Sequence, residues 1–255
     1  MLARHIIPCL DIDKGRVVKG IKIEDVADRS DPLQVCRHYV DQGADELMFI
    51  DITSGVERHA ILIEVLHSIA AELFIPVMVA GGIRSSQDVR QMLQAGADKV
   101  AINTAAIINP DLIAECTGRF GAEAIVVAVD AKRRGGNAKV GWELMSHAGR
   151  KSTGMDAVEW AVKMAEQGAG QLLLTSMDRD GSGKGFDIDL VQAVRQMTIH
   201  PLIAAGGAGS PEDIEAVINQ GGADAVMVAS IFHDGKFTIA EAKNHLMAHN
   251  VPIRH

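Results

Sequence analysis

Residues 75–104 read IPVMVAGGIRSSQDVRQMLQAGADKVAINT, and residues 200–230 read HPLIAAGGAGSPEDIEAVINQGGADAVMVAS. Each stretch has an apolar run that ends in two glycines, then an amphipathic segment, then a second apolar run after Gly-Ala-Asp. This alternation predicts a strand, a helix and a second strand in each stretch. The pairs Gly81-Gly82 and Gly206-Gly207 are 125 positions apart. The chain therefore contains two related halves.

Two further matches extend the duplication toward both ends. Residues 6–15 (IIPCLDIDKG) resemble residues 125–135 (IVVAVDAKRRG), so that Asp11 matches Asp130, and Asp51 likewise matches Asp178. A repeat of half the chain is too long for the 20–50-residue periods of solenoids and propellers. We therefore predict an α/β fold, a single (β/α)8 TIM barrel built from two half-barrels.

The composition agrees with one barrel domain over residues 1–255. The chain has 255 residues, of which 47% are hydrophobic, and such a barrel typically needs about 250 residues. Eight short apolar runs provide its expected strands. These runs are His5–Asp11, Glu46–Asp51, Pro76–Ala80, Lys99–Ile102, Ile125–Asp130, Gln171–Thr175, Pro201–Ala205 and Ala225–Ala229.

Charge and cysteine content exclude several other classes. The net charge of −8 disfavours a nucleic-acid-binding protein. Three cysteines without CxxC spacing indicate no zinc site or disulfide framework, and Cys9 is expected to pack as a small apolar residue. The ten histidines show no metal-ligand spacing, so no metal or cofactor is expected. Neither a membrane span nor a signal peptide is indicated, and we expect a cytoplasmic protein without a membrane partner.

Two connections are longer than the fold requires, residues 14–30 after the first strand and residues 133–153 after the fifth. The second contains Trp142 and several glycines and is expected to form a small hairpin. Loops that follow barrel strands carry the active site. We therefore expect both connections to lie at the catalytic face.

Acidic residues close four of the apolar runs. Asp11 and Asp130 end the first and fifth expected strands, which lie on opposite sides of a barrel, so their carboxylates face each other across its mouth. This arrangement suits a general acid and a general base acting on one substrate. For Asp51 and Asp178 the alternative, a loop carboxylate that bonds backbone amides, has equal weight.

The glycine pairs predict phosphate sites. A residue without Cβ before a helix lets backbone N–H groups approach an anion. The next strands end in Asn103-Thr104 and Ala229-Ser230. Two matching sets imply a bisphosphorylated small-molecule substrate. Tight turns that require glycine remain the alternative for either pair alone.

Eight segments together resemble the cyclase subunit of imidazole glycerol phosphate synthase, nearly end to end. They are IIPCLDIDKGRVVKG at 6–20, DELMFIDIT at 45–53, VAGGIRS at 79–85, GADKVAINT at 96–104, VVAVDAKR at 126–133, LLLTSMDRDG at 172–181, LIAAGGAG at 202–209 and VMVASIFH at 226–233.

The resemblance implies a (β/α)8 lyase of histidine biosynthesis. It would join ammonia from a partner glutaminase, its heterodimer partner, to phosphoribulosylformimino-AICAR phosphate and release imidazole glycerol phosphate and AICAR. Asp11 resembles the family's general acid and Asp130 its general base. The resemblance also assigns substrate or phosphate contacts to Lys19, Gly82, Asn103, Thr104, Asp180, Gly207 and Ser230.

The resemblance further implies an ammonia entry at the opposite end of the barrel, where the family has Arg, Glu, Lys and Glu. The matching positions here are His5, Glu46, Lys99 and Gln171, and the neutral His and Gln are expected to complete a hydrogen-bonded ring. In the first loop Ile23 stands where the family usually has an aromatic residue.

Three alternatives remain open. A sister isomerase of the same pathway shares the duplication, both aspartates and both phosphate sites, and it needs no ammonia. A paralogue that aminates a sugar nucleotide uses the same ammonia-delivery plan. A catalytically inactive barrel would act only as a binding subunit. VVKG at residues 17–20, GADKVAINT and DRDG favour the cyclase.

Overall fold

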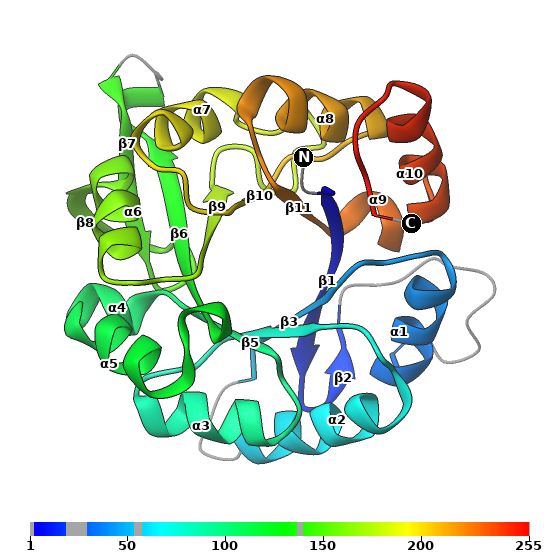
Figure 1. The fold of residues 1–255 in the computed structure, drawn as a ribbon, viewed down its shortest axis with the longest axis horizontal. Coiled ribbons are helices and arrows are strands. Elements are labelled where there is room, and N and C mark those ends of the chain that lie inside the picture. The colour runs from blue at the N-terminus through cyan, green and yellow to red at the C-terminus, as the bar shows by residue number, and fades with distance from the viewer. Residues whose placement is uncertain (1–2, 19–29, 54–57, 137–139, 255) are drawn as a thin grey trace.

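A closed barrel of eight parallel strands, ringed by helices, forms the molecule in the computed structural model (Figure 1), which describes residues 3–18, 30–53, 58–136 and 140–254. The predicted (β/α)8 fold is confirmed. Its barrel strands are β1 (His5–Asp13), β3 (Leu47–Asp51), β4 (Val77–Ala80), β5 (Lys99–Ile102), β6 (Ile125–Arg133), β9 (Gln171–Ser176), β10 (Leu202–Ala205) and β11 (Ala225–Val228).

The barrel closes through two pairings between strands that are distant in the chain. β1 pairs with β11, for example His5 with Ala225, and β5 pairs with β6. All eight strands predicted from the sequence are confirmed, with ends that differ by at most three residues. β4 and β10 begin after Pro76 and Pro201 because proline has no N–H to donate to a neighbouring strand.

Helices connect consecutive barrel strands and cover the outside of the barrel (Figure 1). They are α1 (Pro32–Asp41), α2 (Arg58–Glu72), α3 (Ser86–Gln94), α4 (Thr104–Ile108), α5 (Asp111–Phe120), α6 (Ala157–Glu166), α7 (Ile188–Met197), α8 (Pro211–Ala216), α9 (Ser230–His233) and α10 (Ile239–Ala248), with shorter turns η1 (Ala122–Ala124), η2 (Arg134–Gly136) and η4 (Val217–Gly221).

Three short strands extend the sheet beyond the barrel. β2 (Arg16–Val17) pairs antiparallel with the end of β1. β7 (Trp142–Ser146) and β8 (Lys151–Asp156) form an antiparallel hairpin that continues from β6. The hairpin expected within residues 133–153 is therefore confirmed.

Strand alternation divides the core into two parts. The larger part lies between the strands and the helices, and the smaller part fills the barrel. Cys9 lies in the barrel interior, where it packs as the expected small apolar residue. The interior part contains Ile7, Cys9, Met48, Met78, Ala101, Val126, Leu173, Ile203, Ala205 and Ala225.

The duplication is also visible in single hydrogen bonds. The carboxylate of Asp98 accepts from Val77 N at 2.8 Å, and that of Asp224 accepts from Leu202 N at 3.0 Å. Both aspartates follow Gly-Ala, so the repeated motif ties the start of one strand to the start of the next. Residues 166–170 (EQGAG) occupy the corresponding place before β9. Gly170 replaces the aspartate there, because a Cβ at this position would lie 2.2 Å from Ala122 O.

Matched caps begin the two equivalent helices α3 and α8. The side chains of Ser85 and Ser210 accept from backbone N–H groups of the first turn, and Asp88 and Asp213 bond back to the cap.

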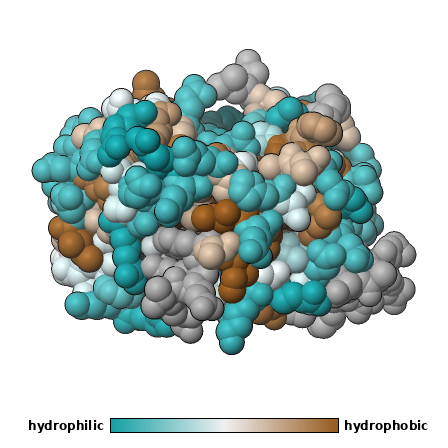
Figure 2. All heavy atoms as spheres, turned by 90° about the horizontal axis from the view of Figure 1, so that it is seen from below, coloured by the Kyte–Doolittle hydropathy of each residue, from teal (hydrophilic) through white to brown (hydrophobic). Residues whose placement is uncertain are grey.

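Among the residues that the structure describes, none of the helices combines the length and apolar character that a membrane span needs. The side of the barrel that carries α2 and α3 is mostly hydrophilic, with separate small apolar areas (Figure 2).

Candidate active site

Alternation along two strands aims two carboxylates into the mouth of the barrel. In β1, Asp11 continues the inward series of Ile7 and Cys9, and in β6, Asp130 continues that of Val126. β1 and β6 are four strands apart in a ring of eight. The structure therefore brings Asp11 and Asp130 to the same end of the barrel, on opposite sides of its mouth, as predicted.

The environment of Asp130 favours its protonated form. Burial, and secondarily the negative charge of Asp180, raises the pKa of Asp130 from 3.8 to about 6. The backbone N–H of Gly149 and the side-chain amide of Asn103 face the carboxylate and oppose this increase. A group with a pKa near 6 exchanges protons readily at physiological pH, which suits an acid–base residue.

The turn of the β7–β8 hairpin contacts the Asp130 carboxylate through the backbone N–H of Gly149. His147 and Ala148 have φ angles of 56° and 55°, which are uncommon for residues with a Cβ, and Gly149 follows with 75°. His147 N donates to Thr104 Oγ1 at 2.9 Å, which fixes the turn to the end of β5. Backbone strain of this kind often occurs at functional sites.

Asn103 and Thr104 lie at the end of β5, where the resemblance assigns substrate contacts. Asn103 is the N-cap of α4, but its side chain makes no capping bond. Its Nδ2 is buried and makes no well-formed hydrogen bond to the described residues, although it faces the Asp130 carboxylate closely enough to oppose the increase in its pKa. A polar group of a ligand in the mouth would satisfy this buried donor.

The glycine pairs have the conformation that the tight-turn alternative required. Gly81, Gly82, Gly206 and Gly207 all have positive φ angles, of 102°, 68°, 83° and 111°. A Cβ on Gly207 would lie 2.3 Å from Gly185 O. Glycine is thus needed at these turns for backbone reasons, and phosphate binding there stays a prediction.

Short helices follow β5 and β11 in matching positions. Thr104 begins α4 and Ser230 begins α9, and neither helix has a side-chain cap. Barrels of this fold often bind phosphate at the loops after the seventh and eighth strands and at the start of a short extra helix. The predicted position of Ser230 agrees with that arrangement.

The other two strand-end aspartates bond backbone amides. Asp51 Oδ1 accepts from Thr53 N at 2.9 Å, and Asp178 Oδ2 accepts from Arg133 N at 2.7 Å. Both residues therefore have the backbone-binding role that was the alternative to a role in the active site. Asp180 is exposed in the turn after β9, within electrostatic reach of Asp130. Lys19, like Ile23, lies outside the described residues.

The four residues expected at the opposite end of the barrel also come together. Lys99 Nζ donates to both carboxylate oxygens of Glu46, at 2.7 and 2.8 Å, and to Gln171 Oε1 at 3.3 Å. His5 Nδ1 lies 3.4 Å from Glu46 Oε1. The contacts form a line from His5 to Gln171 rather than the expected ring, since no hydrogen bond between these two described residues closes it.

Sequence reasoning missed two features. The buried carboxylate of Asp187 accepts from Arg133 Nε at 2.9 Å and from Trp142 Nε1 at 3.1 Å, which fixes the base of the hairpin. The statement that no histidines have metal-ligand spacing is also wrong for one pair. His245 and His249 are four residues apart at the end of α10, and the fold places Glu215 beside them. The spacing was visible in the sequence, but the glutamate required the fold.

A comparison with known families gives a match over most of the chain. The family model described as "Histidine biosynthesis protein" matches residues 5–238. This range covers all eight barrel strands, both mouth aspartates and the four polar residues at the opposite end.

Proposed function

Because the chain belongs to the histidine biosynthesis protein family, and is therefore a TIM-barrel enzyme of that pathway, we propose that it is the cyclase subunit of imidazole glycerol phosphate synthase. The pair of mouth carboxylates, with Asp130 held near a pKa of 6, supports acid–base chemistry, and the line of polar residues at the opposite end of the barrel is the observation that carries the choice of the cyclase. The proposed reaction joins ammonia to phosphoribulosylformimino-AICAR phosphate and yields imidazole glycerol phosphate and AICAR.

The proposed roles follow from the chemistry of the steps. Ammonia attacks the ribulosyl carbonyl, and the resulting carbinolamine loses water to form an imine. Asp11 then donates a proton and Asp130 accepts one, so that the bond to AICAR breaks and the imidazole ring closes. Asn103, whose amide faces Asp130, and the neighbouring Thr104 bind substrate groups, and the loops at Gly82, Gly207 and Ser230 bind its two phosphates. Water must be excluded during these transfers.

The opposite end of the barrel supports the choice of an ammonia-using enzyme. The line of His5, Glu46, Lys99 and Gln171 places polar, hydrogen-bonding groups where the barrel interior meets the N-terminal face. An isomerase needs no entry for ammonia at this end. We propose that ammonia enters here from a glutaminase docked on this face.

Exposed apolar side chains support a docking partner at that face. Phe74 and Ile199 are each 94% exposed, and both lie in connections that lead from a helix into a strand. Such connections lie at the N-terminal ends of the strands, the same end as Glu46. Large exposed apolar groups commonly mark interaction surfaces.

The decisive experiment incubates the purified chain with the ribulosyl substrate at mildly alkaline pH, with and without an ammonium salt, and follows substrate absorbance. The cyclase proposal expects ammonium-dependent turnover that Asp11→Asn abolishes. Asp41→Asn, an exposed substitution on α1, is the matched control and keeps full activity. Turnover of the phosphoribosyl isomer without ammonium would show the isomerase instead.

The docking proposal has its own test. Phe74→Asp and Ile199→Asp are expected to lower turnover with glutamine and a glutaminase subunit while leaving ammonium-dependent turnover unchanged. Loss of both activities, or of neither, would contradict docking at this face.

A further inference from the structure

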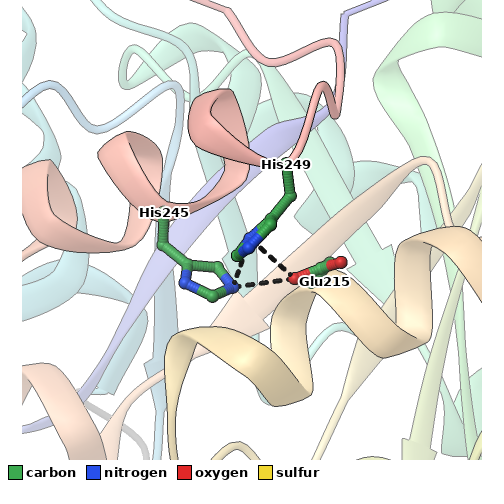
Figure 3. A group of neighbouring side chains, drawn as sticks. All are labelled: Glu215, His245 and His249. Atoms are coloured by element: carbon green, nitrogen blue, oxygen red, sulfur yellow. Dashed lines mark hydrogen bonds and ion pairs between the residues drawn. The ribbon is translucent and has the colours of Figure 1, made fainter.

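Three potential metal ligands meet on the outer helical layer. Glu215 lies on α8, His245 in the last turn of α10, and His249 directly after that helix (Figure 3). In Figure 3 the two imidazole rings point down from α10 toward the glutamate of the neighbouring helix. The three side chains are partly accessible, with exposed fractions of 28%, 18% and 50%.

The ligand atoms converge on one point. His245 Nε2 lies 2.8 Å from Glu215 Oε2, His249 Nδ1 lies 3.1 Å from the same oxygen, and the two nitrogens are 3.2 Å apart. Zinc bonds to nitrogen and oxygen measure about 2.0–2.2 Å, so ligands of a tetrahedral zinc lie roughly 3.3–3.6 Å apart. An outward movement of a few tenths of an ångström would reach that geometry.

Hydrogen bonds alone cannot satisfy all three of these close contacts at once. If both nitrogens donate to Glu215 Oε2, they cannot donate to each other, and two N–H groups then face each other at 3.2 Å. If one of them is an acceptor, its contact with the carboxylate places two lone pairs together. A cation at the common point resolves both conflicts, because all three atoms are then electron-pair donors.

A further carboxylate lies behind the histidine. Glu212 Oε1 is 3.9 Å from His245 Nδ1, the ring nitrogen that points away from Glu215. Histidines that bind metals usually donate this second N–H to a carboxylate or carbonyl, which fixes the tautomer and strengthens the ligand. At 3.9 Å the two groups are not hydrogen-bonded, and the 68% exposed Glu212 side chain would have to move by about 1 Å to accept that bond.

We propose that Glu215, His245 and His249 bind one divalent transition-metal ion of the zinc class. Two imidazoles and one carboxylate suit zinc and its neighbours, whereas magnesium and calcium prefer oxygen ligands. Water occupies the fourth position. The ion joins the end of α10 to α8, and since Asp11 and Asp130 lie in the barrel mouth, its role is to hold these helices together rather than to take part in the reaction there.

The test uses the metal-stripped full chain and zinc chloride. Calorimetric titration is expected to show one zinc ion bound per chain, and titration with cobalt(II) is expected to give the absorption of a four-coordinate ion. At zinc concentrations about a hundred times Kd, the Tm is expected to rise by roughly 5 °C or more. Magnesium is expected to produce none of these changes.

Variants separate this site from zinc bound elsewhere. His249→Ala and Glu215→Gln are each expected to lower zinc affinity at least about tenfold and so to reduce the Tm increase at the same zinc concentration by about half or more. His67→Ala, an exposed histidine on α2, is the matched control and is expected to bind zinc as the unmodified chain does. Wild-type affinity in both site variants, no zinc binding by the unmodified chain, or equal binding of magnesium would each overturn the proposal.

Discussion

Two carboxylates lie inside the same barrel at opposite ends, and their surroundings differ. Glu46, whose side chain is 3% exposed, accepts two hydrogen bonds from Lys99. Burial alone would raise its pKa, but the bonds from His5 and Lys99 and the charge of Lys99 outweigh it, so the pKa of Glu46 lies below its usual range. Asp130 is also buried, and this burial, together with the negative charge of Asp180, raises its pKa to about 6.

The difference shows that one end of the barrel keeps its carboxylate charged and that the other end is suited to proton transfer. A buried carboxylate paired with a cation remains charged and holds neighbouring elements in place. A buried carboxylate that faces a second carboxylate is costly while charged, and it takes up a proton near neutral pH. Such a costly arrangement is expected where chemistry requires it.

The largest expected effect is the loss of turnover when the carboxylate at the barrel mouth is replaced. Asp130→Asn removes a proton acceptor of nearly the same shape, and we expect ammonium-dependent turnover to fall by about two to four orders of magnitude. Steady-state kinetics with saturating ammonium measure this loss, and Asp41→Asn is again the control. A decrease of less than about tenfold would exclude Asp130 as the general base.

At the opposite end, Glu46→Ala leaves the Lys99 ammonium buried without its carboxylate. We expect the free energy of unfolding to fall by about 3–5 kcal/mol, as for other broken buried pairs. Urea denaturation measures the change. Replacing both residues with methionine is expected to restore most of the stability, because no uncompensated charge remains. Equal losses in the single and double variants would show that packing, not charge, is responsible.

Much of the mouth was predictable because it follows from periodicity. Asp11 and Asp130 each end an expected strand, so the convergence of strand ends at the barrel mouth placed both residues there, and their positions on the first and fifth strands placed them on opposite sides. The glycine turns were predictable as turns, but a sequence does not distinguish a glycine required by φ from one required by a phosphate. Gly207 meets the first requirement through its contact with Gly185.

Features that depend on distant contacts were not predictable. The position of Gly149 against Asp130 depends on how the β7–β8 hairpin folds back, and that depends on the bond from His147 to Thr104. The ion pair of Arg133 with Asp187 joins residues 54 positions apart. No local pattern encodes either contact.

The contribution of Asp130 to the free energy of unfolding is expected to depend on pH. Because the pKa of Asp130 is 3.8 when unfolded and about 6 when folded, the native state holds the proton more tightly. Its stabilising contribution is complete below pH 4 and disappears as the pH rises through 6. The difference amounts to about 2–3 kcal/mol. Asparagine carries no charge, so Asp130→Asn is expected to be more stable than the unmodified chain above pH 6 by up to this amount.

Denaturant unfolding at a series of pH values from 4 to 8 checks this expectation. The stability gain of Asp130→Asn should grow between pH 4 and 6 and then level off. Glu46 supplies the contrast, since its lowered pKa gives a contribution that is present above the usual range of glutamate and is lost as the pH falls. A gain that does not vary with pH would mean that packing around residue 130, rather than its charge, determines the stability.

The smallest expected effect separates the two causes of the raised pKa. Asp180→Asn removes the neighbouring charge but leaves Asp130 buried, so its pKa is expected to decrease and still remain well above the usual range of aspartate. Carbon-13 NMR titration of the Asp130 carboxyl measures this directly, without the loss of substrate contacts that turnover would include. Because Asp180 is exposed, molar salt is expected to screen its charge and to lower the pKa of Asp130 in the unmodified chain but not in Asp180→Asn. A pKa that returns fully to the usual range in Asp180→Asn would show that the second carboxylate, not burial, tunes the mouth, and Asp130 would then be poised only while Asp180 remains charged.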